Sequence, residues 1–160
     1  MAFTTHALQK IDGVILTHPH ADAIFGLDDL RQWTMLGRVQ DSIDIYLTQE
    51  TFERVEAAFP YMVDKAHATG SGEIATVKFH VFDQSGETPD HFYVDELKVI
   101  PIPVQHGLYS DGRPYMSMGY RFGDLTYISD VNYVPPESMD KIKGSSVVII
   151  DALKSEPFDR

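Results

Sequence analysis

The apolar positions of the chain follow two periods, one typical of strands and one typical of helices. Runs of apolar residues and apolar–polar alternation predict strands, whereas apolar residues three or four positions apart predict helices. The expected strands are residues 13–17, 43–47, 76–82, 97–104, 115–122, 125–129 and 146–150. The expected helices are residues 23–35, 49–59 and 137–142.

Local signals at the ends of these elements refine the prediction. Asp22 is placed to cap the helix over 23–35, and Thr48 to open the helix over 49–59. Gly123-Asp124 predicts a tight hairpin between two strands. The strand over 97–104 carries two prolines, which cannot donate a ladder hydrogen bond, so we expect an edge or bulged strand.

Histidine and aspartate residues follow the apolar strands. His18, His20 and Asp22 come directly after the first strand, His106 follows the strand over 97–104, and Asp130 follows the strand over 125–129. Because strand ends on one edge of a sheet can converge, these residues form a candidate metal site. In an extended segment the His-x-His spacing places both imidazoles on one side, and we expect Asp22 to keep that parity.

The donor types decide which metal fits. Imidazoles with carboxylates suit zinc, manganese or iron better than calcium. The remaining histidines, His6, His67, His80 and His91, lack such a context and are expected to be surface or turn residues. The Asp28-Asp29 pair is expected to be solvated or paired with Arg31 rather than catalytic.

Composition narrows the class of protein. The length of 160 residues predicts a single domain over residues 1–160. The absence of cysteine excludes disulfides, thiolate nucleophiles, iron–sulfur clusters and Cys-type zinc sites. The formal charge of −11 disfavours long nucleic acid and anionic membranes as partners. No apolar run approaches the roughly 18 residues of a membrane helix, and residues 1–10 lack a signal-peptide core. We therefore expect a soluble, cytoplasmic protein.

The ordered motifs resemble those of the metallo-β-lactamase superfamily. The segments that carry the resemblance are Ile15-Leu-Thr-His-Pro-His-Ala-Asp22, Gly26-Leu-Asp-Asp-Leu-Arg31, Val104-Gln-His-Gly107 and Tyr127-Ile-Ser-Asp130. The second segment is similar to the branch containing phosphoribosyl cyclic phosphodiesterase and the related pyrroloquinoline quinone biosynthesis protein. The resemblance covers residues 11–157, and the order of the motifs is more specific than any one of them.

The resemblance implies an α/β fold, the αββα sandwich, with a metal centre at the strand edge. It implies that His18, His20 and His106 bind a first metal, that Asp22 binds a second, and that Asp130 bridges the two. The cofactor would be a divalent metal, zinc or manganese. One ion would be held tightly and a second weakly, because the second has few ligands from this chain.

Three departures from the family pattern stand out. The family usually has histidine directly after the aspartate of the motif, where this chain has Ala23. Residues 151–160 contain no counterpart of the family's last histidine ligand. Only residues 1–13 precede the first motif, whereas family members carry several strands there. The chain is therefore expected to be the middle of the fold, truncated at both ends, as a fragment or as a natural short form.

The chemistry of such a site predicts metal-dependent hydrolysis. We expect a phosphodiesterase acting on a small-molecule substrate, with Asp22 as the catalytic residue that accepts a proton or hydrogen bond from water. A thioester or lactone hydrolase would use the same centre. A non-catalytic metal-binding or scaffold protein with a degenerate site is the alternative of a different class. A homodimer is left open.

Overall fold

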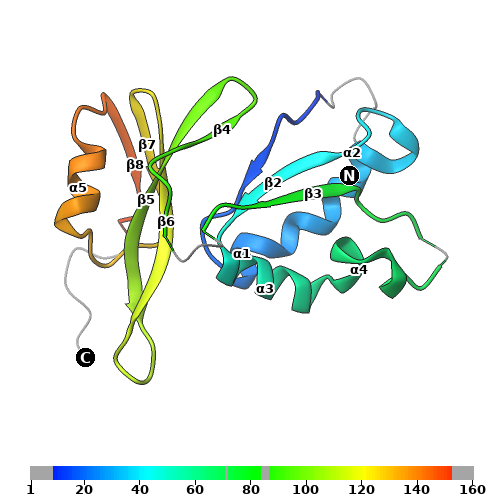
Figure 1. The fold of residues 1–160 in the computed structure, drawn as a ribbon, viewed down its shortest axis with the longest axis horizontal. Coiled ribbons are helices and arrows are strands. Elements are labelled where there is room, and N and C mark those ends of the chain that lie inside the picture. The colour runs from blue at the N-terminus through cyan, green and yellow to red at the C-terminus, as the bar shows by residue number, and fades with distance from the viewer. Residues whose placement is uncertain (1–8, 71, 84–86, 153–160) are drawn as a thin grey trace. The chain divides into compact units, whose positions relative to one another are not determined.

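A computed structural model describes residues 9–70, 72–83 and 87–152 of the chain (Figure 1). It divides into two units, Met1–Glu87 and Thr88–Arg160, which we describe one at a time. The assignment of residues 1–160 to a single domain stays a prediction. Among the described residues, no helix has both the length and the apolar character needed to cross a membrane.

The first unit is a parallel sheet with helical segments packed on one face. Its strands, in the order β1-β2-β3, are β1 (Val14–Ile15), β2 (Ile43–Leu47) and β3 (Val77–Val81). Its helical segments are α1 (Ala21–Ile24), η1 (Phe25–Leu30), α2 (Arg31–Thr34), η2 (Met35–Gly37), α3 (Gln49–Ala58), α4 (Pro60–Val63) and η3 (Lys65–His67). The strands expected over 13–17, 43–47 and 76–82 are thus present, the first and third with shorter bounds.

The core of this unit lies between the sheet and the helices. Alternate residues of β2, Ile43, Ile45 and Leu47, are fully buried. Val55 of α3 belongs to the same buried cluster as Ile45 and Leu47, and Phe52 of α3 packs against it. Burial of a side chain of this kind contributes roughly 1.5–3 kcal/mol relative to exposure, so the sheet and α3 stabilise each other.

The expected start of α3 is confirmed. Thr48 is the N-cap residue, and its side-chain oxygen accepts a hydrogen bond from the backbone N–H of Thr51 at 3.3 Å. Such a cap satisfies one of the backbone donors that the first helical turn leaves without an intrahelical partner.

The single helix expected over 23–35 is wrong. The segment is a succession of short α and 3₁₀ pieces, and the last piece contains Leu36, whose φ is +55°. The apolar residues Ile24, Leu27 and Leu30 recur every three positions, which matches the three residues per turn of a 3₁₀ helix. Glycine at position 26 further weakens a continuous α-helix.

Asp28 in this segment has a structural partner on α4. The Tyr61 hydroxyl donates to Asp28 Oδ1 at 3.0 Å, and Arg31 Nη1 lies 3.4 Å from Asp28 Oδ2. The expected pairing with Arg31 is confirmed for Asp28. Burial raises the pKa of the Tyr61 hydroxyl, and the hydrogen bond to the Asp28 carboxylate raises it further.

The second unit is a five-stranded sheet in the order β4-β5-β6-β7-β8, with one helix packed on it. Its elements are β4 (Phe92–Val94), β5 (Leu97–Leu108), β6 (Pro114–Phe122), β7 (Leu125–Ile128), α5 (Pro136–Ile142) and β8 (Val147–Ile150). The tight hairpin expected at Gly123 is confirmed, because β6 and β7 pair directly across it. The short strand β4 was not expected, since its three residues carry too little periodicity to be recognised.

β5 is longer than the sequence predicts and changes partner along its length. β4 pairs with it only over Leu97–Val99, so its first residues are central in the sheet. Beyond them the carbonyls of Pro101 and Pro103 accept hydrogen bonds from Lys141 and Ser138 of α5. The prolines thus lie where β5 has no β4 partner, and α5 covers the edge that they leave. β5 is regular at both prolines, and its register shift lies beyond them, between Gln105 and Gly107.

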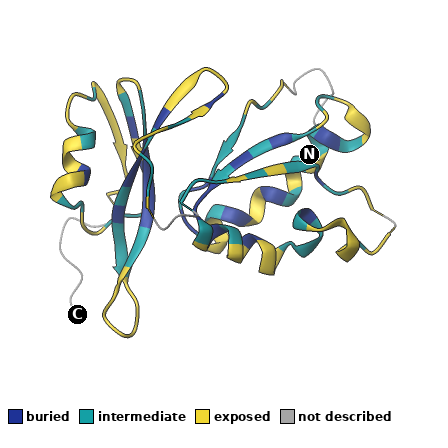
Figure 2. Ribbon diagram, in the orientation of Figure 1, coloured by how far each residue is buried: buried dark blue, intermediate teal, exposed yellow. Residues whose placement is uncertain are grey.

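β8 forms the far end of the sheet and pairs in parallel with β7. Its four apolar residues are all exposed, as Figure 2 shows along the strand. On the face that α5 covers, Ile102, Val104 and Ile128 form the buried cluster, with Ile142 of α5 packed against it. β8 is therefore paired with β7 and exposed despite its apolar sequence.

Close packing of β6 on β7 generates a prediction for Gly119. A Cβ at this position would lie 2.8 Å from Ile128 Cγ1 and 3.0 Å from the backbone oxygen of Tyr127. Because the backbone cannot move aside, we expect Gly119→Ala to lower the free energy of unfolding by about 1–3 kcal/mol in urea denaturation. Gly26→Ala is the matched control, because a Cβ there meets nothing within 4 Å. Equal stability of the two variants would contradict the packing described for β6 and β7.

The Tyr61–Asp28 hydrogen bond predicts a pH dependence. A raised pKa means that the folded state favours the neutral hydroxyl. This stabilisation is fully present below the ordinary tyrosine pKa of 10.0, and it is lost as pH rises through the folded pKa. Asp28→Asn should move the Tyr61 pKa back toward 10.0, measured by NMR titration of the ring carbon that bears the hydroxyl. Asp29→Asn, at the adjacent carboxylate, should leave it unchanged, and an equal shift in both variants would refute the assignment.

Candidate functional site

The histidine motif of the first unit begins where β1 leaves the core. Leu16, one residue beyond β1, is buried, and its backbone N–H donates to the Tyr46 carbonyl of β2 at 2.9 Å. The backbone is therefore held in register with β2 up to the residue before Thr17. The polar segment that follows starts from a fixed point at the carboxyl end of a parallel strand.

His18 and His20 lie side by side at this point. Their ring centroids are 4.8 Å apart, with the planes at 80°. Two imidazoles that share one tetrahedral zinc through Zn–N bonds of about 2.0–2.1 Å have ring centres roughly 5 Å apart, so the pair fits a common ion. The expected juxtaposition of these two side chains is confirmed within the first unit.

Thr17 orients the first of the two rings. Its hydroxyl lies 2.9 Å from Nδ1 of His18, whose side chain is buried with 2% relative exposure. When Nδ1 donates to this hydroxyl, Nε2 is the deprotonated nitrogen, which is the form that a metal requires. The donor chemistry of His18 therefore fits a metal ligand held by a hydrogen bond to its other ring nitrogen.

The sequence led us to expect Asp22 to continue the extended segment, but it does not. His20 has extended backbone angles and is the N-cap residue of α1, so Asp22 falls inside the first helical turn. The alternation of strand side chains stops at Ala21, which makes both the parity argument and the capping role of Asp22 wrong. Asp22 remains exposed and two residues from His20. Its role as a ligand or proton acceptor stays a prediction.

His106 of the second unit lies at the register shift of β5. Gln105 pairs with Met116 and Gly107 with Tyr115, so His106 is the extra residue between two regular pairs. A bulge re-aims the side chain of its extra residue and is frequent next to active sites. The sequence predicted that His106 follows the end of a strand. His106 instead lies within β5.

Asp130 follows β7, and the segment after it forms hydrogen bonds with Gln105, the residue before His106. The backbone N–H of Asn132 donates to the Gln105 carbonyl at 2.8 Å, and the Gln105 N–H donates to the Tyr133 carbonyl at 2.9 Å. The residue before His106 and the segment after Asp130 are therefore joined within the second unit. Convergence of His106 and Asp130 with the histidine pair of the first unit stays a prediction.

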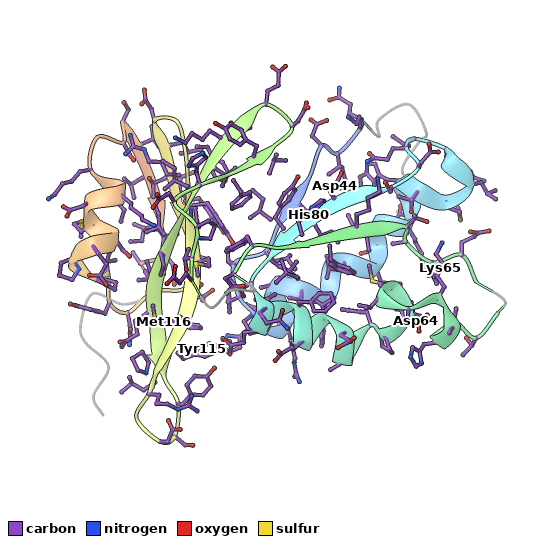
Figure 3. All side chains as sticks on the ribbon, viewed as in Figure 1. Asp44, Asp64, Lys65, His80, Tyr115 and Met116 are labelled. Carbon is purple, nitrogen blue, oxygen red and sulfur yellow. The ribbon has the colours of Figure 1, made fainter. Side chains whose placement is uncertain are left out.

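The histidines expected to be surface or turn residues are exposed where the structure describes them. These are His67, His80 and His91, whereas His6 lies outside the described residues. His80 lies in β3 and contacts two side chains of β2. Its Nε2 lies 2.6 Å from Asp44 Oδ1 of β2, the pair labelled in Figure 3, and its ring stacks on Tyr46 at 4.7 Å. These contacts join β2 to β3 across the face opposite the helices.

Sequence reasoning missed the aromatic surroundings of His106. Its ring centroid lies 5.6 Å from that of Tyr115, labelled in Figure 3 on β6. Tyr115 in turn contacts Tyr109 of the β5–β6 turn. Asp111-Gly112 between two apolar segments is a turn signal that predicts this hairpin. Once the hairpin is recognised, Tyr115 falls opposite the residue after His106.

Comparison with known proteins agrees with these motifs. Residues 1–159 match the family described as the beta-lactamase superfamily domain. A solved structure described as a new diphosphatase from the PhnP family is 28% identical, with a TM-score of 0.75 over 96% of this chain. A protein named octanoyltransferase, from Porphyromonas gingivalis (strain ATCC BAA-308 / W83), is 24% identical over 149 residues, or 92% of this chain.

The matches cover only part of each relative. The chain spans 52% of the diphosphatase structure and 26% of the octanoyltransferase. The elements described above and the match to the diphosphatase structure confirm the expected α/β, metallo-β-lactamase-like fold. With a family match over almost its whole length, the chain belongs to the beta-lactamase superfamily domain family and, with it, to the metallo-β-lactamase superfamily.

Proposed function

We propose that this protein is a metal-dependent hydrolase that cleaves a small phosphodiester. The observation that carries the proposal is the His18–His20 pair, two imidazoles at a spacing suited to one ion, just beyond the carboxyl end of β1. The similarity to a PhnP-family diphosphatase supports phosphorus over carbon as the centre attacked.

The proposed ligand set is the one that the sequence motifs imply. His18, His20 and His106 would hold a divalent metal, zinc or manganese, Asp130 would bridge to a second ion, and Asp22 would bind that second ion. A divalent metal held there makes water a nucleophile at neutral pH and neutralises charge that develops on phosphoryl oxygens. One ion should be bound tightly, because the second has only the two carboxylates from this chain.

The chain's own residues complete the reaction. Asp22, exposed in the first turn of α1, would accept the proton of the attacking water. Thr17 would keep the His18 ring in the orientation and tautomer that ligation needs. The formal charge of −11 repels polyanions at long range, which favours a compact substrate over long nucleic acid. We further propose that the protein is soluble and cytoplasmic and that its substrate is found in the same compartment.

Two alternatives are outcomes of the same assay. A thioester or lactone hydrolase would use the same ligands for attack on a carbonyl carbon. A non-catalytic protein would bind metal weakly or not at all, and Ala23, where the family usually has histidine, is the feature that supports it. Parallel assays with a phosphodiester and a thioester, on protein of known metal content, separate the three.

Activity should depend on metal and on Asp22. We expect hydrolysis of bis(p-nitrophenyl) phosphate to cease on chelation and to return with zinc or manganese. Asp22→Ala should lower kcat by about 10²–10⁴-fold, because a positioned base contributes this much, with the free energy of unfolding unchanged. His67→Ala, at an exposed histidine of η3, is the matched control and should leave kcat unchanged. Full activity after chelation would refute the metal mechanism, and an unchanged kcat in Asp22→Ala would remove this residue from it.

Thr17 should control metal affinity without binding metal itself. Thr17→Val keeps the side-chain shape and removes the hydroxyl beside His18 Nδ1, so zinc affinity should fall by about 10–100-fold in a competitive chelator titration. Thr17→Ser retains the hydroxyl and should bind zinc as the wild type does. The wild-type titration should show about one tightly held equivalent per chain. Equal affinity of the valine and serine variants would show that the hydrogen bond does not act on the site.

A further inference from the structure

The hairpin between β5 and β6 extends beyond the proposed metal ligand His106. Tyr109 donates its backbone N–H to the Arg113 carbonyl at 2.8 Å and closes the loop. Gly112, with φ of +85°, donates to the Tyr109 carbonyl at 2.9 Å and makes the turn that an L side chain would strain. The tip of this hairpin is therefore an ordered structure attached to the strand that carries His106.

A continuous series of ring contacts leads from His106 to this tip. The Tyr115 ring centroid lies 5.6 Å from that of His106 and 5.1 Å from that of Tyr109, with the two tyrosine planes at 85°. Cζ of Arg113 lies 5.1 Å from the Tyr109 ring centroid. These separations are typical of aromatic pairs and of cation–π contacts. Tyr109 is therefore two ring contacts from His106, a span that a phosphate ester with one sugar or short linker can bridge.

Asp111 holds the guanidinium of Arg113 in place. Arg113 Nε donates to Asp111 Oδ2 at 2.7 Å, and the Arg113 backbone N–H donates to Asp111 Oδ1 at 3.0 Å. These hydrogen bonds keep the pKa of the Asp111 carboxyl below its ordinary value. The carboxylate is therefore ionised at neutral pH and balances the charge of Arg113. The tip presents a planar cation whose charge is already neutralised.

The arrangement is more exposed than core packing requires. The Arg113 side chain is 73% exposed and Tyr109 is 37% exposed. An exposed ion pair contributes little to stability, and a cross-strand aromatic pair contributes roughly 0.2–1 kcal/mol. Hairpin stability thus accounts for the contact between Tyr109 and Tyr115, whereas the exposed Arg113 guanidinium beside the Tyr109 ring adds little to it. Fixed planar groups at a surface suit stacking against another planar group.

We propose that the Tyr109–Arg113 hairpin holds a planar aromatic group of the substrate, so that the preferred substrate is a phosphodiester bearing an aromatic or nucleobase-like substituent. This inference rests on the proposed function, because it names the substrate class of the same site. An anionic substituent fits less well, since Asp111 neutralises Arg113 and would repel it. Stacking requires only the planar faces of Arg113 and Tyr109.

The test uses two ligands with the same phosphonate group and different substituents, at a pH where both are fully ionised. Isothermal titration calorimetry of the zinc-loaded protein compares phenylphosphonate with methylphosphonate. We expect the wild type to bind the phenyl ligand more tightly, on the order of tenfold, which is the scale of one stacking contact. Tyr109→Ala and Arg113→Lys should remove this preference and leave methylphosphonate affinity unchanged. Tyr109→Phe, which keeps the ring, should retain it.

Tyr93→Ala is the matched control. Tyr93 is an exposed tyrosine of β4 and pairs opposite Lys98, eight residues before His106 on β5. At about 3.3 Å per residue, this places it more than 20 Å from His106 along the strand. The phenyl preference should survive this substitution. Equal affinity for both ligands in the wild type, no binding of either, or equal losses in Tyr93→Ala and Tyr109→Ala would overturn the proposal.

The result is distinguishable from failure of the proposed function. If bis(p-nitrophenyl) phosphate is not hydrolysed but the Tyr109-dependent phenyl preference is present, the hairpin assignment stands and the reaction is wrong. If the diester is hydrolysed with the same KM in wild type and Tyr109→Ala, and the phosphonates bind equally, the reaction stands and the hairpin assignment is wrong.

Discussion

The parallel pairing of β1 with β2 determines where the histidine motif lies. β1 is only two residues long, yet its pairing is extended by the Leu16 hydrogen bond to Tyr46 and by burial of the Leu16 side chain. Without these contacts, nothing in a two-residue strand would fix the next four residues in space. Because both the backbone and a buried side chain are held up to Leu16, Thr17 and His18 emerge in a defined direction, and the two imidazoles come together.

In the second unit, β5 has the corresponding role, and its irregularities decide the local chemistry. Proline at positions 101 and 103 removes two backbone donors from the part of the strand that lacks a β4 partner, and α5 side chains satisfy the carbonyls there. The extra residue at position 106 then breaks the register. A regular strand would have placed this histidine by alternation alone. At the bulge the alternation is interrupted, and the His106 ring lies beside Tyr115.

Composition and local structure agree about the kind of chemistry available. A chain without cysteine must use imidazole and carboxylate donors for a transition metal, and these are the side chains that follow its strands. A chain of formal charge −11 gains little from general attraction of anions, so recognition has to come from short-range contacts. The neutralised Arg113–Asp111 pair and the adjacent tyrosines are contacts of that kind.

The sequence by itself determined most of the elements and the family, and it limited any metal donors to imidazole and carboxylate groups. Buried strands and the α3 cap were predictable because apolar period and capping chemistry are local. The tertiary structure decided what depends on partners distant in the chain. Residues 23–35 form short α and 3₁₀ pieces rather than one α-helix, Asp22 lies in a helical turn, and β5 continues beyond His106. The tertiary structure also joined Tyr109, Tyr115 and Arg113, because ring contacts across a hairpin depend on register, which spacing along one strand does not reveal.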